Sequence, residues 1–173
     1  KVLSSDLINQ IAAGEVIERP ASIIKELVEN SIDAGADRIE IIISEGGKSF
    51  IKVTDNGRGM DEPDLNLCFR RHATSKISTP DDLVGVRSLG FRGEALPSIA
   101  SVARVTAVSG IDDGGGFELA IEGGEIKYFR PAAAVKGTAI QVKNLFFNVP
   151  ARRKFLKKTE TEYRAVTSMI RQY

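Results

Sequence analysis

The feature that most constrains the fold is an amphipathic segment that begins at Pro20 and ends at Gly35. Proline suits the first turn of a helix, where its missing N–H would have no partner, and glycine suits the residue just beyond a helix. The segment therefore predicts a helix with one buried stripe. The apolar residues that make this stripe recur with the helical period: Ile23, Ile24, Leu27, Val28 and Ile32.

Beyond this helix the pattern changes to that of strands. Two isoleucine- and valine-containing runs, residues 38–44 and 49–55, flank a Gly-Gly pair, which predicts a β-hairpin. A short helix is expected at residues 62–71, and the glycine-containing residues 72–98 form a long irregular region, which is either functional or wrongly assigned. Further elements are expected as strands at residues 102–109, 117–122, 125–130 and 138–144, and as a helical segment from Pro150.

This order predicts an α+β fold, with helices on one face of a mixed, largely antiparallel sheet, and not alternating βαβ units. The chain has 173 residues, so we expect one domain, 1–173. With 42% hydrophobic and 27% charged residues it has the composition of a soluble globular protein. The single cysteine, Cys68, excludes an intrachain disulfide, and the single histidine, His72, excludes a Cys/His zinc cluster. A start without methionine and an end inside a helical pattern suggest a fragment.

The net charge of +1 gives no general argument for nucleic-acid binding. Residues 149–173, however, hold seven basic side chains against two acidic ones, Glu160 and Glu162. This stretch is either a phosphate-facing patch or the solvated face of a helix. We favour the second interpretation.

A first polar cluster lies on the Pro20 helix. Glu26, Asn30 and Asp33 follow the helical spacing, so they share one stripe. A carboxylate there can take a proton from an attacking water, and one turn away an amide oxygen suits Mg²⁺. By spacing alone, a solvent-exposed polar face is the favoured interpretation.

A second cluster, Asp55 to Met60, follows a strand that ends on a carboxylate. Two glycines one residue apart, Gly57 and Gly59, let the backbone turn closely around a ligand or simply turn. Asp55 can accept a hydrogen bond from an exocyclic amine such as that of adenine. An Asx turn explains the same residues equally well.

A third cluster comprises residues 90–96, with residues 73–76 upstream. Glycines before a helix start present backbone N–H groups to an anion, and hydroxyl and ammonium groups upstream suit phosphate contacts. The spacing is neither that of a P-loop nor that of a Rossmann turn. Nucleotide binding here would therefore need another geometry.

Taken together, the motifs KELVENSIDAG, DNGRGM, ATSKI and SLGFRGEAL resemble, in this order, the nucleotide-binding motifs of the GHKL superfamily. That superfamily includes type II DNA topoisomerases, the heat-shock chaperone ATPase, sensor histidine kinases and MutL. The runs IAAGEVIERPASIIKELVENSIDAG and LFFNVPARRKFLKK are most similar to the MutL branch. The resemblance covers nearly the whole chain and implies the GHKL (Bergerat) ATPase fold, a two-layer sandwich.

The resemblance also assigns roles to single residues. It implies that Glu26 activates water, that Asn30 holds Mg²⁺ between the phosphates of ATP, and that Asp55 binds the adenine amino group. Thr138 would support Asp55 and the adenine. The other expected ATP contacts lie in the glycine turn after Asp55 and in a lid over the phosphates: Gly57, Gly59, Met60, Thr74, Ser75, Lys76, Gly90, Phe91, Arg92, Gly93, Glu94, Ala95 and Leu96.

Partners follow from the same resemblance: ATP, a second copy of the full protein after ATP binding, a mismatch-recognition protein, and DNA bound weakly and without specificity. We expect no membrane association, because no apolar run approaches about 18 residues. The expected location is intracellular, in the cytoplasm or nucleoid of a bacterium or the nucleus of a eukaryote. In the family a second domain supplies a lysine to the γ-phosphate. We therefore expect the fragment to hydrolyse ATP very slowly or not at all, and to be monomeric.

The leading functional hypothesis is a slow ATPase that acts as a switch in DNA mismatch repair, with ATP ordering residues 72–98. The alternative is a nucleotide-gated scaffold in which hydrolysis is incidental. A histidine kinase domain shares the fold, but the GFRGEAL motif and Glu26 disfavour it. A topoisomerase ATPase would need DNA-cleaving parts elsewhere.

Overall fold

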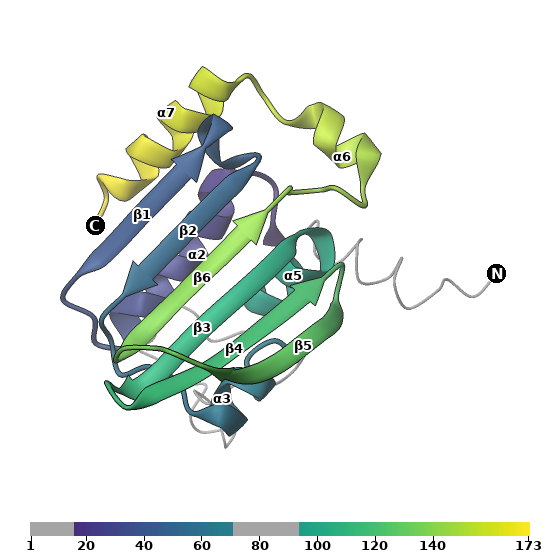
Figure 1. Ribbon diagram of the computed structural model, residues 1–173. Coiled ribbons are helices and arrows are strands. Elements are labelled where there is room, and N and C mark those ends of the chain that lie inside the picture. Colours follow the sequence, from purple (N-terminus) through teal and green to yellow (C-terminus); the bar gives the residue numbers. More distant parts are fainter. Residues whose placement is uncertain (1–15, 71–93) are drawn as a thin grey trace, which may run out of the picture.

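One six-stranded antiparallel sheet organises the part of the chain that the computed structural model describes, residues 16–70 and 94–173. The strand order is β1-β2-β6-β3-β4-β5, and helices cover one face of the sheet (Figure 1). Every pairing between neighbouring described strands is antiparallel, so the expected parallel component is not found among them. The strands are β1 (Ile39–Ser44), β2 (Phe50–Asp55), β3 (Arg104–Asp112), β4 (Gly115–Glu122), β5 (Glu125–Ala132) and β6 (Gly137–Lys143).

The helices that pack on this sheet come from three parts of the chain. The long helix α2 lies behind the central strands, and α7 packs on α2 and on the short turn η1 after β1 (Figure 1). The helical elements are α2 (Pro20–Asp33), η1 (Glu45–Gly47), α3 (Glu62–Leu67), α5 (Ala95–Val102), α6 (Pro150–Phe155) and α7 (Thr159–Ile170). The predicted α+β sandwich is thus confirmed.

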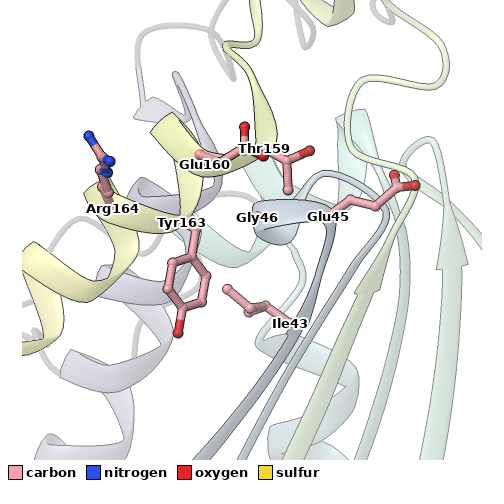
Figure 2. Close-up of a pocket in the computed structure, with 7 residues that line it drawn as sticks. All are labelled: Ile43, Glu45, Gly46, Thr159, Glu160, Tyr163 and Arg164. Atoms are coloured by element: carbon pink, nitrogen blue, oxygen red, sulfur yellow. The ribbon is translucent and has the colours of Figure 1, made fainter.

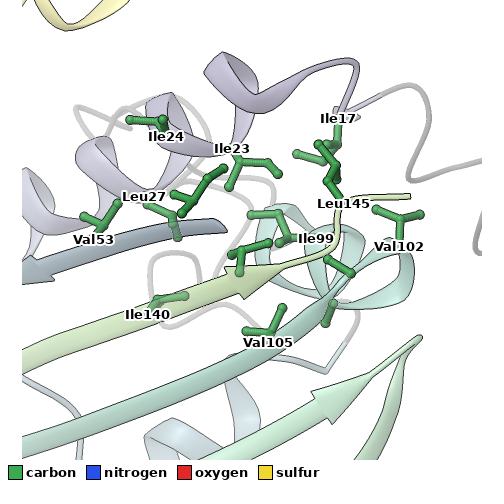
Figure 3. Packing of buried hydrophobic residues seen from close by; sticks show 14 of the residues in the cluster. Ile17, Ile23, Ile24, Leu27, Val53, Ile99, Val102, Val105, Ile140 and Leu145 are labelled. Carbon is green, nitrogen blue, oxygen red and sulfur yellow. The ribbon is translucent and has the colours of Figure 1, made fainter. Parts of the chain in front are cut away.

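The core lies between α2, α5 and the sheet. Ile23 and Leu27 of α2 face Ile99 of α5, with Val53 and Ile140 contributed by β2 and β6 (Figure 3). All five are buried. Burial of large aliphatic side chains is the main stabilising contribution to such a fold, at about 1.5–3 kcal/mol for each. The core thereby fixes α2 against the ends of the strands.

The predicted buried stripe of α2 is right for its first three turns and wrong for Ile32, which is 38% exposed. Ser31, one turn after Leu27, takes the inward position and is only 3% exposed. The position faces the polar end of β2 and not the apolar core, because Ser31 donates a hydrogen bond to Asp55 there. A serine inside the stripe therefore marks where the core ends.

Several predicted boundaries also differ from the structure. The helix expected at residues 62–71 ends at Leu67. Val102 belongs to α5 and not to the following strand, because Ile99 and Val102 lie on one buried helical face. The end of the predicted irregular region is therefore helical, and its residues 72–93 lie outside the described residues. The final helical segment is two helices, separated by an extended Leu156.

Two further side chains, Cys68 and Phe146, pack on the core or beneath α6. Cys68 packs against the core, and burial raises the pKa of its thiol to about 12. Phe146 is buried beneath α6, where the Arg152 guanidinium lies 5.4 Å from the centre of its ring. Across the described ranges, no helix has both the length and the apolar character that a bilayer crossing requires.

Candidate functional site

Three polar residues meet where β2, β6 and β3 lie side by side. Asp55 at the end of β2 pairs with Thr138 of β6, and Thr138 pairs with Ser109 of β3. Asp55 continues the alternation of the buried residues Ile51 and Val53, so it points to the helix-covered face of the sheet. Directly opposed side chains on neighbouring strands lie about 4.5–5.5 Å apart at Cβ. The strand register therefore gathers the three side chains beneath α2.

The Asp55 carboxylate is held in one orientation by two donors. Ser31 of α2 donates from Oγ to Oδ2 at 2.8 Å, and the backbone N–H of Gly57 donates to Oδ1 at 2.9 Å. The second contact is the Asx turn that the sequence left open as an alternative. A carboxylate has about four acceptor positions. The turn therefore coexists with free acceptor capacity for a ligand amine.

Ser109 links the turn after β2 to the start of β6. Its Oγ accepts a hydrogen bond from the Met60 backbone N–H at 2.8 Å and donates to the Gly137 carbonyl at 2.9 Å. The Thr138 hydroxyl lies 2.8 Å from the same oxygen. Ser109 is 1% exposed. A buried hydroxyl with three partners is a rigid support, since each unsatisfied polar group would cost about 1–3 kcal/mol.

The glycine turn lies against the backbone of β3. Gly59 has φ +71°, and a Cβ atom there would lie 1.9 Å from the Gly110 carbonyl oxygen. Gly57 is buried against Ala34, just beyond α2. The predicted glycine positions therefore allow close backbone approach, as expected. The side chain of Met60 packs against the core.

Glu26 and Asn30 lie one turn apart on α2, and both are half-buried. Asp33, one turn further, is also half-buried. Residues at this spacing have Cβ atoms about 5–6 Å apart. The predicted polar stripe is thus present on the helix whose other face contacts Asp55 through Ser31. A carboxylate and an amide oxygen lie beside each other there.

The last three residues of the predicted phosphate-contacting segment lie at the start of α5. Glu94 precedes the helix and its side chain does not cap it, while Ala95 and Leu96 occupy the first turn. Leu96 packs against the core, which fixes the start of the helix. The other predicted contacts of this region lie outside the described residues: Thr74, Ser75, Lys76, Gly90, Phe91, Arg92 and Gly93.

A family model described as histidine kinase-, DNA gyrase B- and HSP90-like ATPase matches residues 18–117. This range is more than half of the chain and contains both α2 and the Asp55 turn. The chain belongs to this ATPase family.

Within the family the chain is similar to MutL proteins. It is 59% identical over 98% of its length to the DNA mismatch repair protein MutL of Rhizobium johnstonii, and 56% identical over 93% to that of Syntrophotalea carbinolica. It spans 28% and 26% of these two proteins.

Solved structures agree with this assignment. The MutL ATPase domain of Aquifex aeolicus complexed with ADP is 38% identical, with a TM-score of 0.69 over 91% of this chain and 55% of that one. The N-terminal domain of a DNA repair protein is 33% identical, with a TM-score of 0.79 over 94% and 47%. The GHKL fold expected from the sequence is thereby confirmed.

An open groove elsewhere on this ATPase domain, of about 410 Å³, is not the predicted site. Ile43 and Gly46 line it on the side of β1 and η1, and Tyr163 and Arg164 line it on the side of α7 (Figure 2). Asp55 pairs with Ile39, at the opposite end of β1. The groove therefore lies at the far end of the sheet from the Asp55 turn.

The oxygen donors of the site fit the Mg²⁺ ion that GHKL ATPases imply. Mg²⁺ takes few protein ligands when it binds phosphates, and it keeps several waters. Asn30 offers an amide oxygen on the half-buried face of α2, with Glu26 one turn away. No group of three or more His, Cys, Asp or Glu side chains suited to a metal occurs within residues 16–70 and 94–173. One amide oxygen and one carboxylate a helical turn apart are compatible with an ion that takes few protein ligands.

Two residues of the site, Ser31 and Ser109, were not predicted. Each leaves a signal in the sequence, because each is a hydroxyl residue at a position that the local period makes inward-facing. Ser31 follows Leu27 by one helical turn, and Ser109 continues the alternation of Val105 and Ala107. A polar residue that replaces an apolar one in a buried series needs a partner. Here the partners are Asp55 for Ser31, and the Met60 N–H, the Gly137 carbonyl and Thr138 for Ser109.

Proposed function

We propose that these 173 residues form one ATPase domain that binds ATP with Mg²⁺, hydrolyses it slowly and acts as a switch in DNA mismatch repair. The observation that carries the proposal is the oriented Asp55 carboxylate, held by Ser31 and Gly57 beside a glycine turn that approaches β3. Family membership and the ADP-complexed relative support it.

Asp55 supplies adenine recognition in this proposal. Ser31 and Gly57 donate to its two oxygens, so the carboxylate stays oriented and still has lone pairs for the exocyclic amine. Thr138 and Ser109 brace the neighbouring strands. A hydrogen bond from a neutral amine to a carboxylate contributes about 1.5–3 kcal/mol. This interaction separates adenine from bases that present a carbonyl at the same position.

Glu26 supplies the base for hydrolysis. Its carboxylate accepts a proton from a water that attacks the γ-phosphorus. The bond from that phosphorus to the β–γ bridging oxygen breaks, and ADP and inorganic phosphate leave. Asn30, one turn away, would hold Mg²⁺, which supplies charge neutralisation to the phosphates when bound. A base on a core-packed helix is fixed in position, which favours an aligned attack.

The switch is the part of the proposal that depends most on the family. We infer that ATP orders a lid that contains residues 73–76 and 90–93 and adjoins the start of α5, and that the full protein then dimerises and engages a mismatch-recognition protein and DNA. Analytical ultracentrifugation with ADP and with a non-hydrolysable ATP analogue tests this step. A full-length protein whose sedimentation is the same with both nucleotides would contradict it.

Two measurements test the ATPase itself. Calorimetry of Mg-ATP against the chain should give a single site. Single-turnover hydrolysis should then slow about 10²–10⁴-fold in Glu26→Gln with little change in affinity, because a general base contributes this much. Glu40→Gln, an exposed substitution on β1, is the matched control. Wild-type turnover in Glu26→Gln would remove the proposed base.

Exposed basic residues favour a scaffold as the second candidate function. No residue of α6 is buried, and Arg152, Arg153 and Lys154 lie in its last turn. Arg152 donates to the Ile17 carbonyl, so Arg153 and Lys154 are the better candidates for phosphate contacts. Binding to duplex DNA that does not weaken between 50 and 200 mM salt, a range over which phosphate contacts lose affinity by roughly tenfold or more, would exclude this patch.

A further inference from the structure

The helix α7 buries a carboxylate against the helix that carries the proposed base. Of the twelve residues of α7, only Glu162 and Val166 are buried, and Glu162 is 1% exposed. A fully buried acid is rare unless it is paired. α7 packs along α2 and also on η1, so Glu162 lies where three elements meet.

Both oxygens of Glu162 are used. Oε2 accepts from Arg19 Nε at 3.0 Å and lies 3.0 Å from Arg19 Nη2, while Oε1 accepts from the backbone N–H of Lys157 at 2.8 Å. Replacing a buried ion pair by apolar residues is often neutral or stabilising. Net stability is therefore a weak explanation for the pair, and a geometrical role is the better one.

Arg19 directly precedes Pro20, the first residue of α2, and its carbonyl accepts the Ser22 N–H. The same end of α2 is held a second time, because Arg152 donates to the Ile17 carbonyl at 2.9 Å. Two of the three residues before the helix, Arg19 and Ile17, are thus tied to α7 and α6. The other end of α2 is tied to the sheet by Ser31 and Asp55.

Close packing keeps α7 in place. A Cβ atom on Gly46 of η1 would lie 2.7 Å from the Thr159 carbonyl and 2.9 Å from Glu162 Cβ. The two elements face each other beside the open groove (Figure 2). α7 therefore approaches η1 at backbone distance, and Glu162 has little room to move.

Glu26 lies between the two anchors of α2. At 1.5 Å per residue it is about 10 Å along the axis from Arg19 and about 7.5 Å from Ser31. If the Arg19 anchor is lost, the helix stays attached at its Asp55 end. A small tilt about that end moves Glu26 more than it moves Ser31. Misplacement by 1 Å in an active site can cost about 10²-fold in rate.

We propose that Glu162 is a positioning residue for ATP hydrolysis: through Arg19 it sets the position of α2, and so of Glu26, for catalysis and not for nucleotide binding. This inference rests on the proposed function, since it presupposes that Glu26 is the base.

A second polar contact between the C-terminal end of the chain and α2 supports the same inference. The Tyr173 hydroxyl, beyond the end of α7, donates to Glu29 Oε1 at 2.6 Å, and Glu29 is a buried residue of α2 between Glu26 and Asn30. Burial and this hydrogen bond raise the pKa of Tyr173 to about 12, so the phenol remains a donor at neutral pH. α7 thus contacts α2 through polar groups at both ends.

Glu162→Gln is the test, because glutamine keeps the shape and removes the charge. We expect kcat to fall about 3–10-fold, a fraction of the loss from a 1 Å displacement, while KM and the calorimetric Kd for Mg-ATP change less than twofold. Glu160→Gln, exposed on the same helix, is the matched control and should behave as wild type. Arg19→Gln should reproduce the loss, and the double variant should add nothing to it.

Hydrogen exchange gives a readout that does not depend on turnover. In Glu162→Gln, backbone amides of residues 22–25 should exchange faster, whereas those of residues 27–31 should not. Three results would overturn the inference. They are an equal change of exchange at residues 22–25 and 27–31 in Glu162→Gln, an unchanged kcat, or a parallel loss of kcat and of affinity for Mg-ATP.

Glu26→Gln, measured in parallel, separates the two proposals. If it retains turnover, the proposed function fails. If it is inactive while Glu162→Gln hydrolyses ATP and exchanges like wild type, only the positioning role fails.

Discussion

Two polar clusters lie on this sheet and differ in location, burial and charge. The Asp55 cluster consists of Asp55, Ser31, Ser109 and Thr138, on the helix-covered face. The Glu118 cluster consists of Glu118, Tyr128 and Arg130, on the outer strands β4 and β5. There Tyr128 donates to Glu118 at 2.9 Å, and Arg130 donates through two nitrogens at 2.9 and 3.1 Å.

The Glu118 cluster contains more charged groups than the Asp55 cluster, but its side chains are more exposed and less firmly held. The Arg130 side chain is 59% exposed, and its ring contact with Tyr128 is open to solvent. Exposed ion pairs contribute about 0–1 kcal/mol. The Asp55 cluster has one charge, but Ser31 and Ser109 are almost fully buried. Buried polar groups with several partners therefore hold the candidate site more firmly than a concentration of exposed charge holds the Glu118 cluster.

The largest expected effect is on nucleotide affinity. Asp55→Asn should weaken Mg-ATP binding about 10–100-fold, because a charged hydrogen bond contributes roughly 1.5–3 kcal/mol. Asp37→Asn is the control, since Asp37 is exposed and its carboxylate accepts a hydrogen bond from the Asn56 side chain. Calorimetry measures both. An unchanged heat of binding in Asp55→Asn would remove this cluster from the nucleotide site.

Alanine substitutions at two glycines can separate the effect of a close backbone contact on stability from the effect of a positive φ. Gly59 and Gly35 have φ +71° and +74°, so alanine strains both alike. A Cβ on Gly59 would overlap the Gly110 carbonyl, whereas nothing lies within 4 Å of one on Gly35. Gly59→Ala should therefore lower the free energy of unfolding by about 1–3 kcal/mol more than Gly35→Ala. Equal urea midpoints and slopes would show that the turn tolerates a side chain.

Removing the Ser31 hydroxyl tests the support of Asp55. Ser31→Ala should weaken Mg-ATP binding roughly fivefold, because it removes one of the two donors that orient the Asp55 carboxylate, and ligand binding loses only part of a hydrogen bond worth about 1.5–3 kcal/mol. Ser22→Ala, on the same helix but far from Asp55, should leave the affinity unchanged. If both variants bind like wild type, the carboxylate is oriented by the Gly57 N–H alone.

The smallest effect belongs to the Glu118 cluster and depends on pH. Hydrogen bonds from Arg130 and then Tyr128 hold the pKa of Glu118 below its ordinary value of 4.5. A lowered folded pKa stabilises the fold above the unfolded pKa, and this contribution disappears as pH falls through the folded pKa. The free energy of unfolding of wild type should thus exceed that of Glu118→Gln by less than about 1 kcal/mol at pH 7.

Urea titrations at several pH values measure that difference, which should shrink below pH 4.5. A difference that grows on acidification would reverse the assigned sign. Mg-ATP affinity should be the same in both proteins, and any loss would make the Glu118 cluster part of the site.

Much of this fold follows from periodicity. The Pro20 helix, the Gly46–Gly47 hairpin and the later strands are where the pattern places them, because apolar spacing decides which face each element buries. The errors lie at ends and irregular segments. Val102 was expected in a strand, since a short apolar run fits either element until packing against α2 decides between them.

The candidate site was also predicted in part from the sequence and in part not. The motifs predict roles for Glu26, Asn30, Asp55 and the glycine turn, because the resemblance depends on residue type and local spacing. The pairing of Asp55 with Thr138, and of Thr138 with Ser109, required the strand order, in which β6 enters between β2 and β3. Local sequence does not encode which distant strand becomes a neighbour.

The α+β class, the resemblance to GHKL ATPases and the residues predicted to bind a nucleotide all follow from the amino-acid sequence. The contacts that support those residues are visible only in the folded chain: Ser31 and Ser109 at the Asp55 end of β2, and Glu162 against Arg19 at the start of α2. The physical reason is that a hydrogen bond or buried ion pair between residues 143 positions apart depends on how the whole core packs. Residue type and hydrophobic periodicity predict which face of a helix or strand a side chain lies on. Tertiary packing determines which residue that side chain contacts.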